Sequence, residues 1–517
     1  MSFAISGQIF EKFKGIRERN GVNSSGSISA VDAVNVELVQ TEIADGTGIK
    51  SMNGNTVVYN LPEGFKVLGI FKSVQENIIY KFIYAENDLK GALFYINLTG
   101  EPEIVVDNLS VTGECSGLTM TSSAYDVFVF TNGSEAKTVC FTADELYGEA
   151  VRTIEAEDYL GRKITWLSMC EWNGFLVVAS PFGVHASHQN DIYVWNDDPQ
   201  DVADSWYIDF GKKTTAVFSF SNGLYIFTQD DISYLSTTPN DTANSVLMNA
   251  GMNGCFSYQS IVKHDTFLFF YDNNQKNIYY LQILDTGQTR PAGPVALEIQ
   301  SYFSDITSFK MYSCIYNNRN EIWCLINGDI LIFDYAQQEW IMRQEQKISA
   351  VALIQNRIYT GGDEGKVFVE NINNDFDGKF FPAVYKTTYI NSIGNSNLKK
   401  QKTPLLLVLN DEFVNDFWVE LTCDSKTRQA KRVRVTASGG GVYADDSVEI
   451  VTPSEELFDC AVFAAENTYA KKVVEITTPQ TWYNIAVKIY TDSPEQGFYI
   501  TSMELKNIWA KTKTKGR

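Results

Sequence analysis

The feature that most constrains the fold is a unit of two apolar runs joined by a polar turn, which recurs along the chain. The turns follow one another at steps of about 46 residues, the length of one four-stranded blade of a β-propeller. Identity between the copies is low, so the repeat lies in the pattern of apolar and polar residues. The seven turns are centred near Asp88, Gly133, His185, Asp230, Asn274, Gly328 and Gly362.

The sixth copy, NEIWCLINGDILIFDYAQQEW (320–340), indicates how each unit folds. Its two apolar runs meet at Asn327-Gly328, the dipeptide that most favours a two-residue hairpin turn. The runs do not alternate cleanly, which predicts strands covered on both faces. Stacked blades supply that cover, because each inner hairpin then lies between its neighbours. We therefore predict an all-β chain with a six- or seven-bladed β-propeller over 62–375; a β-sandwich of fewer, longer sheets is the alternative.

The two ends of the chain do not follow this rhythm. Residues 1–61 contain Gly- and Ser-rich stretches such as NGVNSSGSIS and are predicted to form an arm. Residues 376–517 contain seven runs of strand length, among them TPLLLVLN and WYNIAVKIYT, which are typical of a β-sandwich or barrel. A second β domain is therefore expected after the propeller.

Charge is distributed unevenly along the chain, whose net charge is −21. Residues 1–382 carry an excess of about 22 negative charges, whereas 383–517 are close to neutral. A protein that grips phosphates needs a basic surface, so this balance argues against tight nucleic-acid binding. An acidic surface that only keeps the chain soluble is the plainer interpretation.

No membrane or secretory segment is predicted. The start, MSFAISGQIFEKFKG, lacks a basic segment followed by an apolar core, and no apolar run approaches the roughly 20 residues of a membrane span. We expect a soluble chain that is not exported by that route.

Residues with catalytic or metal-binding chemistry are sparse. The eight cysteines stand singly, mostly inside apolar runs, and are predicted to be reduced, buried thiols. His185 and His188 are expected in a loop and are not favoured as a metal site. Carboxylates such as Asp230, Asp329 and Asp334 follow strands, where Asp is an ordinary turn residue, although a glycosidase pair remains an alternative. We predict no catalytic residues, no metal and no cofactor.

Basic residues gather at two places in the last quarter. The C-terminal KTKTKGR (511–517) and the run KTRQAKRVRV could each contact phosphate or an acidic protein. The second run faces acidic segments such as Glu455-Glu456 in the same domain, and we interpret it as a subunit contact. Its candidate assembly residues are Lys426, Arg428, Lys431, Arg432 and Arg434.

The order of these features resembles the tail nozzle proteins of short-tailed bacteriophages. These are also called packaged-DNA stabilisation proteins, and the muzzle-type proteins of crAss-like phages are their relatives. The resemblance covers most of the chain as architecture. The segments that carry it are Ile28–Asn55, Ser219–Ser245, Met252–Leu281, Gly328–Trp340 and Ile358–Val369.

The resemblance implies a propeller flanked by a platform that both chain ends build, with the N-terminal arm packed on it. It implies a homohexameric ring in the virion tail, made in the bacterial cytoplasm, between portal-proximal adaptor proteins and distal tail proteins. The ring would retain packaged double-stranded DNA and conduct it during ejection without reading its sequence. Members of this family are not enzymes, and no cofactor is implied.

A conduit for DNA should avoid a basic wall, because every neutralised phosphate adds a salt-sensitive grip. If residues 62–382 surround the channel, part of their negative charge should face it. The candidate channel-facing residues are Glu86, Asp88, Asp230, Asp231, Asp363 and Glu364. Two alternatives stay open, a propeller that recognises host-surface glycans and a propeller glycosidase.

Overall fold

The computed structural model divides into two compact units, which are described separately. The terminal unit comprises Met1–Asn55, Asp329–Gln346 and Asn371–Arg517, and the propeller unit comprises Thr56–Gly328 and Lys347–Glu370. The structure describes residues 2–511 without 6–7, 18–26, 42–45, 98, 123–124, 142–150, 159, 182, 196–200, 222, 284–288, 318, 345–346, 373–374, 391–398, 402–403, 411–414, 425–427, 437–448, 452–453, 459–468, 479–480, 483 and 506–507.

The propeller unit consists, in its described part, of six four-stranded sheets and one hairpin. Five sheets are consecutive in sequence, and the sixth joins β32–β34 to the early strand β7. The sheets are β8–β11 (Lys66–Gln75, Ile78–Glu86, Gly91–Ile96, Pro102–Leu109), β12–β15 (Ser116–Ser122, Tyr125–Thr131, Ala136–Val139, Val151–Thr153), β16–β19 (Ser168–Trp172, Phe175–Ser180, Gly183–Ala186, Trp206–Asp209), β20–β23 (Thr214–Phe220, Gly223–Thr228, Ile232–Leu235, Leu247–Gly251), β24–β27 (Ile261–His264, Phe267–Asp272, Asn277–Ile283, Thr289–Ala292) and β32–β34 with β7 (Ile348–Ile354, Arg357–Gly362, Lys366–Glu370, Asn55–Asn60). The hairpin is β28 (Phe309–Tyr316) with β29 (Arg319–Ile326).

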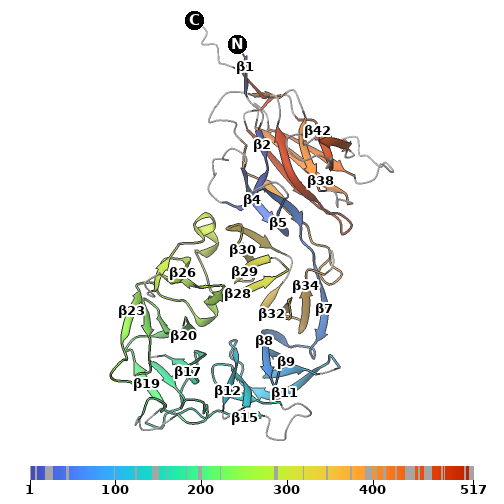
Figure 1. Ribbon diagram of the computed structural model, residues 1–517. Helices are drawn as coiled ribbons and strands as arrows, with labels where there is room; N and C mark the ends of the chain where they lie inside the picture. The colour runs from blue at the N-terminus through green and yellow to red at the C-terminus, as the bar shows by residue number, and fades with distance from the viewer. Residues whose placement is uncertain are drawn as a thin grey trace. The chain divides into compact units, whose positions relative to one another are not determined.

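The first strands of these seven members form a closed ring (Figure 1). β8 contacts β12, β12 contacts β16, and β16 contacts β20; β20 contacts the 3₁₀ turn η1 (Tyr258–Ser260), which leads into β24. β24 contacts β28, β28 contacts β32, and β32 returns to β8. The predicted propeller is confirmed, and in the described chain its ring has seven members.

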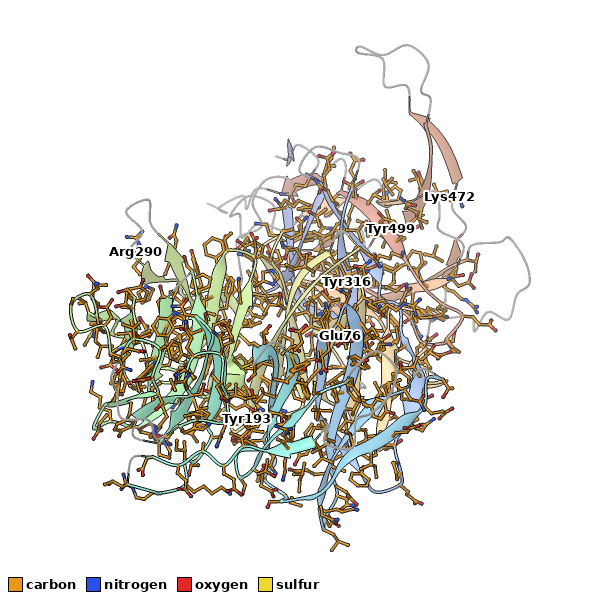
Figure 2. The ribbon with its side chains drawn as sticks, turned by 60° about the horizontal axis from the view of Figure 1, so that its bottom comes forward. Glu76, Tyr193, Arg290, Tyr316, Lys472 and Tyr499 are labelled. Carbon is orange, nitrogen blue, oxygen red and sulfur yellow. The ribbon has the colours of Figure 1, made fainter. Side chains whose placement is uncertain are left out.

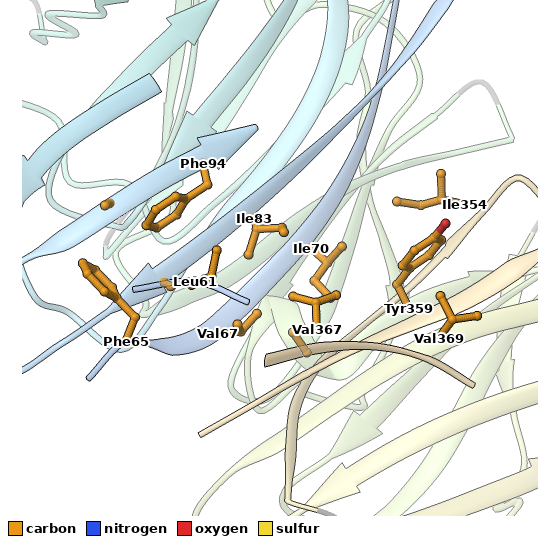
Figure 3. Close-up of a cluster of buried hydrophobic side chains, with 13 residues drawn as sticks. Leu61, Phe65, Val67, Ile70, Ile83, Phe94, Ile354, Tyr359, Val367 and Val369 are labelled. Atoms are coloured by element: carbon orange, nitrogen blue, oxygen red, sulfur yellow. The ribbon is translucent and has the colours of Figure 1, made fainter. Parts of the chain in front are cut away.

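The ring closes where the last sheet packs against the first. Val67, Ile70 and Phe94 of the first sheet share one buried cluster with Ile354 and Val369 of the last (Figure 3). β7 precedes β8 in sequence but completes the last sheet, so the two ends of the ring are also joined by strand pairing. Non-local closure of this kind makes the stability of every sheet depend on its neighbours.

The recurring hairpins are the second and third strands of the sheets. β9 pairs with β10, β13 with β14, β17 with β18, β21 with β22, β25 with β26 and β33 with β34. Every residue of β17 and β21 is buried, as expected for strands covered on both faces. The prediction that these hairpins are innermost is wrong, because a further strand lies inside each one. Those first strands, such as SGLTMTS in β12, are less apolar, so they do not appear in the repeated pattern of apolar runs.

One predicted turn position is also wrong. His185 lies within strand β18, and the turn between β17 and β18 falls earlier, between Ser180 and Gly183. Pro181 opens this turn. Apolar residues precede and follow it, so the sequence pattern does not mark the turn there.

The Asn327-Gly328 turn has the predicted backbone. Both residues have positive φ, 51° and 97°, as a type I′ hairpin turn requires. The chain passes here into the terminal unit, to which 329–346 belong with β30 (Asp329–Asp334) and β31 (Glu339–Arg343). The predicted propeller range 62–375 differs from this division, which counts 329–346 with the terminal unit. An apolar pattern marks a strand but not the unit that buries it.

The start of the predicted propeller range differs as well. The propeller unit begins at Thr56, because β7 supplies the last sheet with its fourth strand. This strand lies within 1–61, the range predicted to form the N-terminal arm.

The terminal unit is β-sandwich-like, with strands that bury alternate residues. β4, β35, β44, β38 and β39 pair in that order, and β41, β42, β37 and β45 pair in that order. Its strands are β1 (Ser2–Ile5), β2 (Gln8–Phe10), β3 (Lys12–Ile16), β4 (Ser27–Val34), β5 (Val36–Gln40), β6 (Thr47–Ser51), β30, β31, β35 (Val384–Thr387), β36 (Lys399–Gln401), β37 (Leu405–Leu409), β38 (Phe417–Asp424), β39 (Arg428–Val435), β40 (Glu449–Val451), β41 (Ser454–Phe458), β42 (Tyr469–Ile476), β43 (Thr481–Trp482), β44 (Asn484–Tyr490), β45 (Tyr499–Leu505) and β46 (Ile508–Lys511).

β30 and β31 are held tightly inside this unit. A Cβ atom on Gly15 would lie 2.2 Å from the carbonyl oxygen of Trp340, so only glycine fits the approach of β3 to β31. Arg17 forms a 3.1 Å ion pair with Glu339 beside it. Among the described residues, no helix is long and apolar enough to cross a membrane.

The closure of the propeller can be tested at Tyr59 on β7. The aromatic ring of Tyr59 stacks on that of Tyr359 with centres 6.4 Å apart, and both tyrosine hydroxyls accept hydrogen bonds of 3.1 Å from Lys81. Tyr59→Ala should lower the free energy of unfolding in urea by about 1–2 kcal/mol, since it removes the stacking and one charged hydrogen bond. Tyr125→Ala, at a 60% exposed ring, is the matched control and should change it by less than about 0.5 kcal/mol. Equal effects of the two substitutions would contradict the role of β7.

Candidate functional site

The turns between second and third strands lie at one end of the sheets, which we call the turn end. The strand order places them there with the linkers that join one sheet to the next. By the same strand order, the turns between first and second strands lie at the other end; Glu76 and Tyr316, which are labelled in Figure 2, stand next to two of these turns. All six candidate channel-facing residues belong to the turn end, so it is the candidate functional surface of the propeller unit.

Turn geometry explains why this end is rich in Asn and Asp. The side-chain oxygen of Asn87 accepts hydrogen bonds from the N–H groups of Leu89 and Lys90, each 2.9 Å. Asp272 does the same for Asn274 (2.8 Å) and Gln275 (3.2 Å). These are Asx turns, in which the side chain replaces a backbone acceptor.

Glu86, one of the candidate channel-facing residues, has a structural contact in the propeller unit. Its side chain is buried, and its carboxylate accepts hydrogen bonds from the Tyr84 hydroxyl (2.7 Å), Thr112 N–H (2.9 Å) and Gly113 N–H (3.0 Å). Burial, followed by the hydrogen bond to this carboxylate, raises the pKa of Tyr84 above its ordinary value, so the hydroxyl stays a donor. Glu86 thus fastens the linker between the first two sheets. A carboxylate before a turn gave no sign of this role.

Asp88 and Asp230 are exposed at the turn end, as predicted from their turns. Asp230 accepts a 3.2 Å hydrogen bond from the side-chain amide of Asn274 on the neighbouring sheet. Asp231 is half-buried and forms an ion pair with Lys212. That ion pair and a hydrogen bond from Thr228 hold the pKa of Asp231 below its usual value despite burial, which acts in the opposite direction.

Asp363 and Glu364 are also exposed, but both have cationic partners. Lys66 lies 2.7 Å from Asp363, and Lys366 lies 3.6 Å from Glu364. Of the six candidates, one is buried and three are paired with lysine, so the turn end is less acidic than the count along the sequence suggests.

Two of the basic candidates of the terminal unit, Arg432 and Arg434, lie on one sheet beside the same aromatic ring. Arg432 pairs with Asp492 at 2.9 Å, and its guanidinium lies 3.9 Å from the centre of the Trp418 ring. Arg434 pairs with Asp416 at 2.9 Å and lies 5.9 Å from the same ring. Cation–π contacts of this kind contribute roughly 0.5–1 kcal/mol each at exposed sites.

Trp418 stands opposite Arg434 on one side and opposite Tyr490 on the other. The rings of Trp418 and Tyr490 stack at 6.5 Å, and Lys488 lies 4.5 Å from Tyr490. We call these residues, with Arg432, the cation–aromatic strip. Sequence reasoning missed the aromatic members, because the strand register that brings β38, β39 and β44 together cannot be read from the separate runs.

The other assembly candidates are less defined. Arg428 and Lys431 belong to β39, and Lys426 lies outside the described residues. Glu455 and Glu456 on β41 pair in backbone register with Lys472 and Lys471 on β42. The predicted contact between subunits at the basic run stays a prediction.

The histidines are structural. His185 is buried in β18, where its Nε2 lies 3.1 Å from Ser180 Oγ, and not in a loop as predicted. His188 Nδ1 lies 3.0 Å from the carbonyl oxygen of Gln189. The described part of the chain contains no group of three or more His, Cys, Asp or Glu side chains able to hold a metal ion.

The described cysteines are free thiols. Cys115, Cys255, Cys314, Cys324 and Cys423 are buried, as predicted. Burial raises the pKa of Cys115 and of Cys255 to about 12, so neither forms a thiolate at neutral pH. Cys140 and Cys170 are partly exposed, and Cys460 lies outside the described residues.

Comparison with known proteins gives no family. No family model matches the chain. No curated protein matches it either. Solved structures that resemble it include the computationally designed Ika8 protein (9% identity, 61% of this chain, 100% of the other, TM-score 0.37) and BamB from Moraxella catarrhalis (10%, 72%, 98%, 0.36). The extracellular domain of BT4673 from B. thetaiotaomicron also resembles it (11%, 78%, 50%, 0.39). These similarities carry no information on function.

The buried role of Glu86 predicts a large effect on stability. Glu86→Ala should lower the free energy of unfolding by about 2–3 kcal/mol, because buried donors such as the Tyr84 hydroxyl lose their acceptor. Asp88→Ala, two residues away and exposed, should change it by less than about 0.5 kcal/mol. Urea unfolding of both variants measures the difference, and a neutral Glu86→Ala would show that the carboxylate does not fasten the linker.

The buried His185 predicts a pH dependence of stability. Burial lowers its pKa to about 4, whereas the unfolded chain protonates this imidazole below roughly 6.5. The unfolded state therefore binds more protons between these values, and the free energy of unfolding should fall as pH drops through that window. His185→Gln should make this fall shallower in urea titrations at pH 7, 6, 5 and 4.5. An unchanged slope would mean that His185 is not buried as a neutral group.

Proposed function

We propose that this chain is a structural protein of a bacteriophage virion. Six copies would form the tail nozzle that closes the portal channel, retains packaged DNA and conducts it during ejection. The protein would be made in the host cytoplasm and meet adaptor proteins on the portal side and distal tail proteins on the other. The function needs no cofactor and no reaction, only a ring and a channel wall.

The observation that carries the proposal is that both chain ends build the terminal unit. β1 pairs with β46 so that Ser2 stands opposite Lys511, and β2 pairs with β45 so that Gln8 stands opposite Leu505. The propeller is an excursion of the chain between these ends. A propeller accompanied by a platform made of both ends is the layout that the resemblance to nozzle proteins implies.

The turn end supports the proposed passage of DNA. Asp88 and Asp230 are exposed, and in the described part of the chain no Lys or Arg lies within ion-pair distance of either. Duplex DNA passing such a wall is repelled only at close range, since charges are screened over about 8 Å at physiological salt. The ion pairs of Asp231, Asp363 and Glu364 keep this repulsion weak, which suits a wall that centres the duplex without opposing its passage.

The oligomeric state and the location test the proposal together. Size-exclusion chromatography with light scattering should give a hexamer, and an antibody against the chain should label the tails of virions. A monomer at all concentrations, together with unlabelled tails, would overturn it. The alternative functions, glycan recognition and glycoside hydrolysis, predict instead binding on glycan arrays or release of reducing sugar without a ring.

The assembly role of the terminal unit has its own test. A chain without Met1–Ser51 and 376–517 should not be incorporated into virions. We propose that these segments make most contacts with neighbouring copies and with the adaptor. Normal incorporation of the shortened chain would contradict that part of the proposal. A chain that lacks only the C-terminal segment KTKTKGR (511–517) is the control.

Charge reversal at the turn end should slow ejection. Asp88→Lys with Asp230→Lys changes the charge by about four per chain and gives phosphates new salt-sensitive contacts. DNA release from virions should be slower than for wild type, and more so at low salt. Glu76→Lys, at the exposed turn between β8 and β9 at the other end of the sheet, should leave the rate unchanged. Unchanged ejection of the double variant at low salt would remove the turn end from the channel wall.

A further inference from the structure

The turn end of the propeller unit contains a cavity of about 530 Å³, which we call the mouth cavity. Its lining comes from the linkers that enter three sheets, with Glu114, Lys213 and Gln259, and from the start of β28, with Lys310. The turns that carry Asp230 and Asn274 complete it. The volume falls within the range of small-ligand pockets, about 300–1,000 Å³. Asp230 lines this cavity and also belongs to the proposed channel wall.

Hydrogen bonds between two linkers hold one lining residue of the mouth cavity, Gln259. Tyr258, in the linker before β24, donates its hydroxyl proton to the carbonyl oxygen of Cys115, in the linker before β12. These two linkers enter sheets that are three places apart in a ring of seven, so the bond crosses the axis. Gln259, which lines the cavity, donates a 3.0 Å hydrogen bond to the same hydroxyl. The lining residue Gln259 is therefore tied to the hydrogen bond between Tyr258 and Cys115.

A buried cation completes the wall. Lys310 is 9% exposed, and its ammonium donates to the carbonyl oxygens of Leu68 (3.3 Å) and Ser349 (3.0 Å). An ammonium has three N–H groups, so these bonds hold it in place and leave one donor. Burial lowers the pKa of Lys310.

The rim is held in position by its own contacts. The side-chain amide of Asn274 donates to the carbonyl oxygen of Gln229 (3.1 Å) and to Asp230 Oδ1 (3.2 Å), which leaves its own oxygen as an acceptor. Phe256 is half-buried and packs edge-on against Tyr271, with ring centres 6.2 Å apart. The cavity thus offers an oriented ring beside oriented polar groups before any ligand arrives.

The lining chemistry selects a class of ligand. It combines side-chain amides, hydroxyls, two carboxylates and two ammonium groups, so it is balanced in charge. A phosphate would meet Glu114 and Asp230 as well as the lysines, and an apolar molecule would leave the amides and charges without partners. Vicinal hydroxyl groups both donate and accept, and a pyranose ring has an apolar face that can rest on an aromatic side chain. We propose that the mouth cavity binds a neutral saccharide.

This inference does not rest on the nozzle proposal, because a tail protein and a free binding module can both carry a sugar site. The first measurement is binding of the purified full chain to an array of neutral hexose- and N-acetylhexosamine-terminated oligosaccharides. The best binder is then followed by saturation-transfer NMR and titration. No neutral glycan bound above background, or binding confined to acidic glycans, would overturn the inference.

Matched variants locate the site. Asn273→Ala removes an exposed lining amide, and Ser308→Trp fills the cavity while keeping the backbone N–H that Ser308 gives to Asn327. Each should weaken binding at least about tenfold. Gln275→Ala, on the same turn but outside the lining, should bind as wild type, and equal melting temperatures confirm folding. Binding retained by both lining variants would place the sugar elsewhere and overturn the inference.

Discussion

The structure of the propeller unit depends on one constraint, that its second strands have two apolar faces. Strand β21 buries all six of its residues, and so does β17. A strand of this kind cannot stand in a sheet that leaves one face in water. Each sheet must lie between two others, and a row of such sheets has no acceptable end unless it closes on itself. The ring of seven, with β7 as the fourth strand of the last sheet, satisfies this condition for every member.

Closure then determines where polar groups gather. Each linker must travel from the outer strand of one sheet to the inner strand of the next, and so crosses the turn end. Buried or anchored side chains fasten these linkers: Glu86 holds the linker at Thr112, Asn327 accepts 2.8 Å and 3.1 Å bonds from the N–H groups of Thr307 and Ser308, and Tyr258 reaches Cys115. The mouth cavity lies among these fastened linkers, so the hydrogen bonds that hold the linkers also position part of its lining.

The sequence was sufficient for the pattern of hairpins and insufficient for their partners. A run such as GLYIFT predicts a strand that is buried on both faces, because such burial requires apolar residues at successive positions. The inner strands and the placement of β30 and β31 depend on tertiary packing, which leaves no periodic signal. Glu86 and His185 show the same limit for single residues: a polar side chain next to a turn reads as exposed, and only the linker or strand packed over it makes it buried.

Charge counted along the chain also differs from charge presented at a surface. At the turn end Lys66, Lys212 and Lys366 neutralise three of the candidate carboxylates, and in the terminal unit Asp492 and Asp416 neutralise Arg432 and Arg434. Exposed pairs of this kind contribute only about 0–1 kcal/mol to stability, so their effect is mainly on what can approach. A partner that docks on the cation–aromatic strip meets stacked rings and satisfied charges, and its affinity must come from shape and aromatic contact more than from net charge. Salt should therefore alter contacts at this strip less than it alters the approach of any charged partner to Asp88 and Asp230 at the turn end.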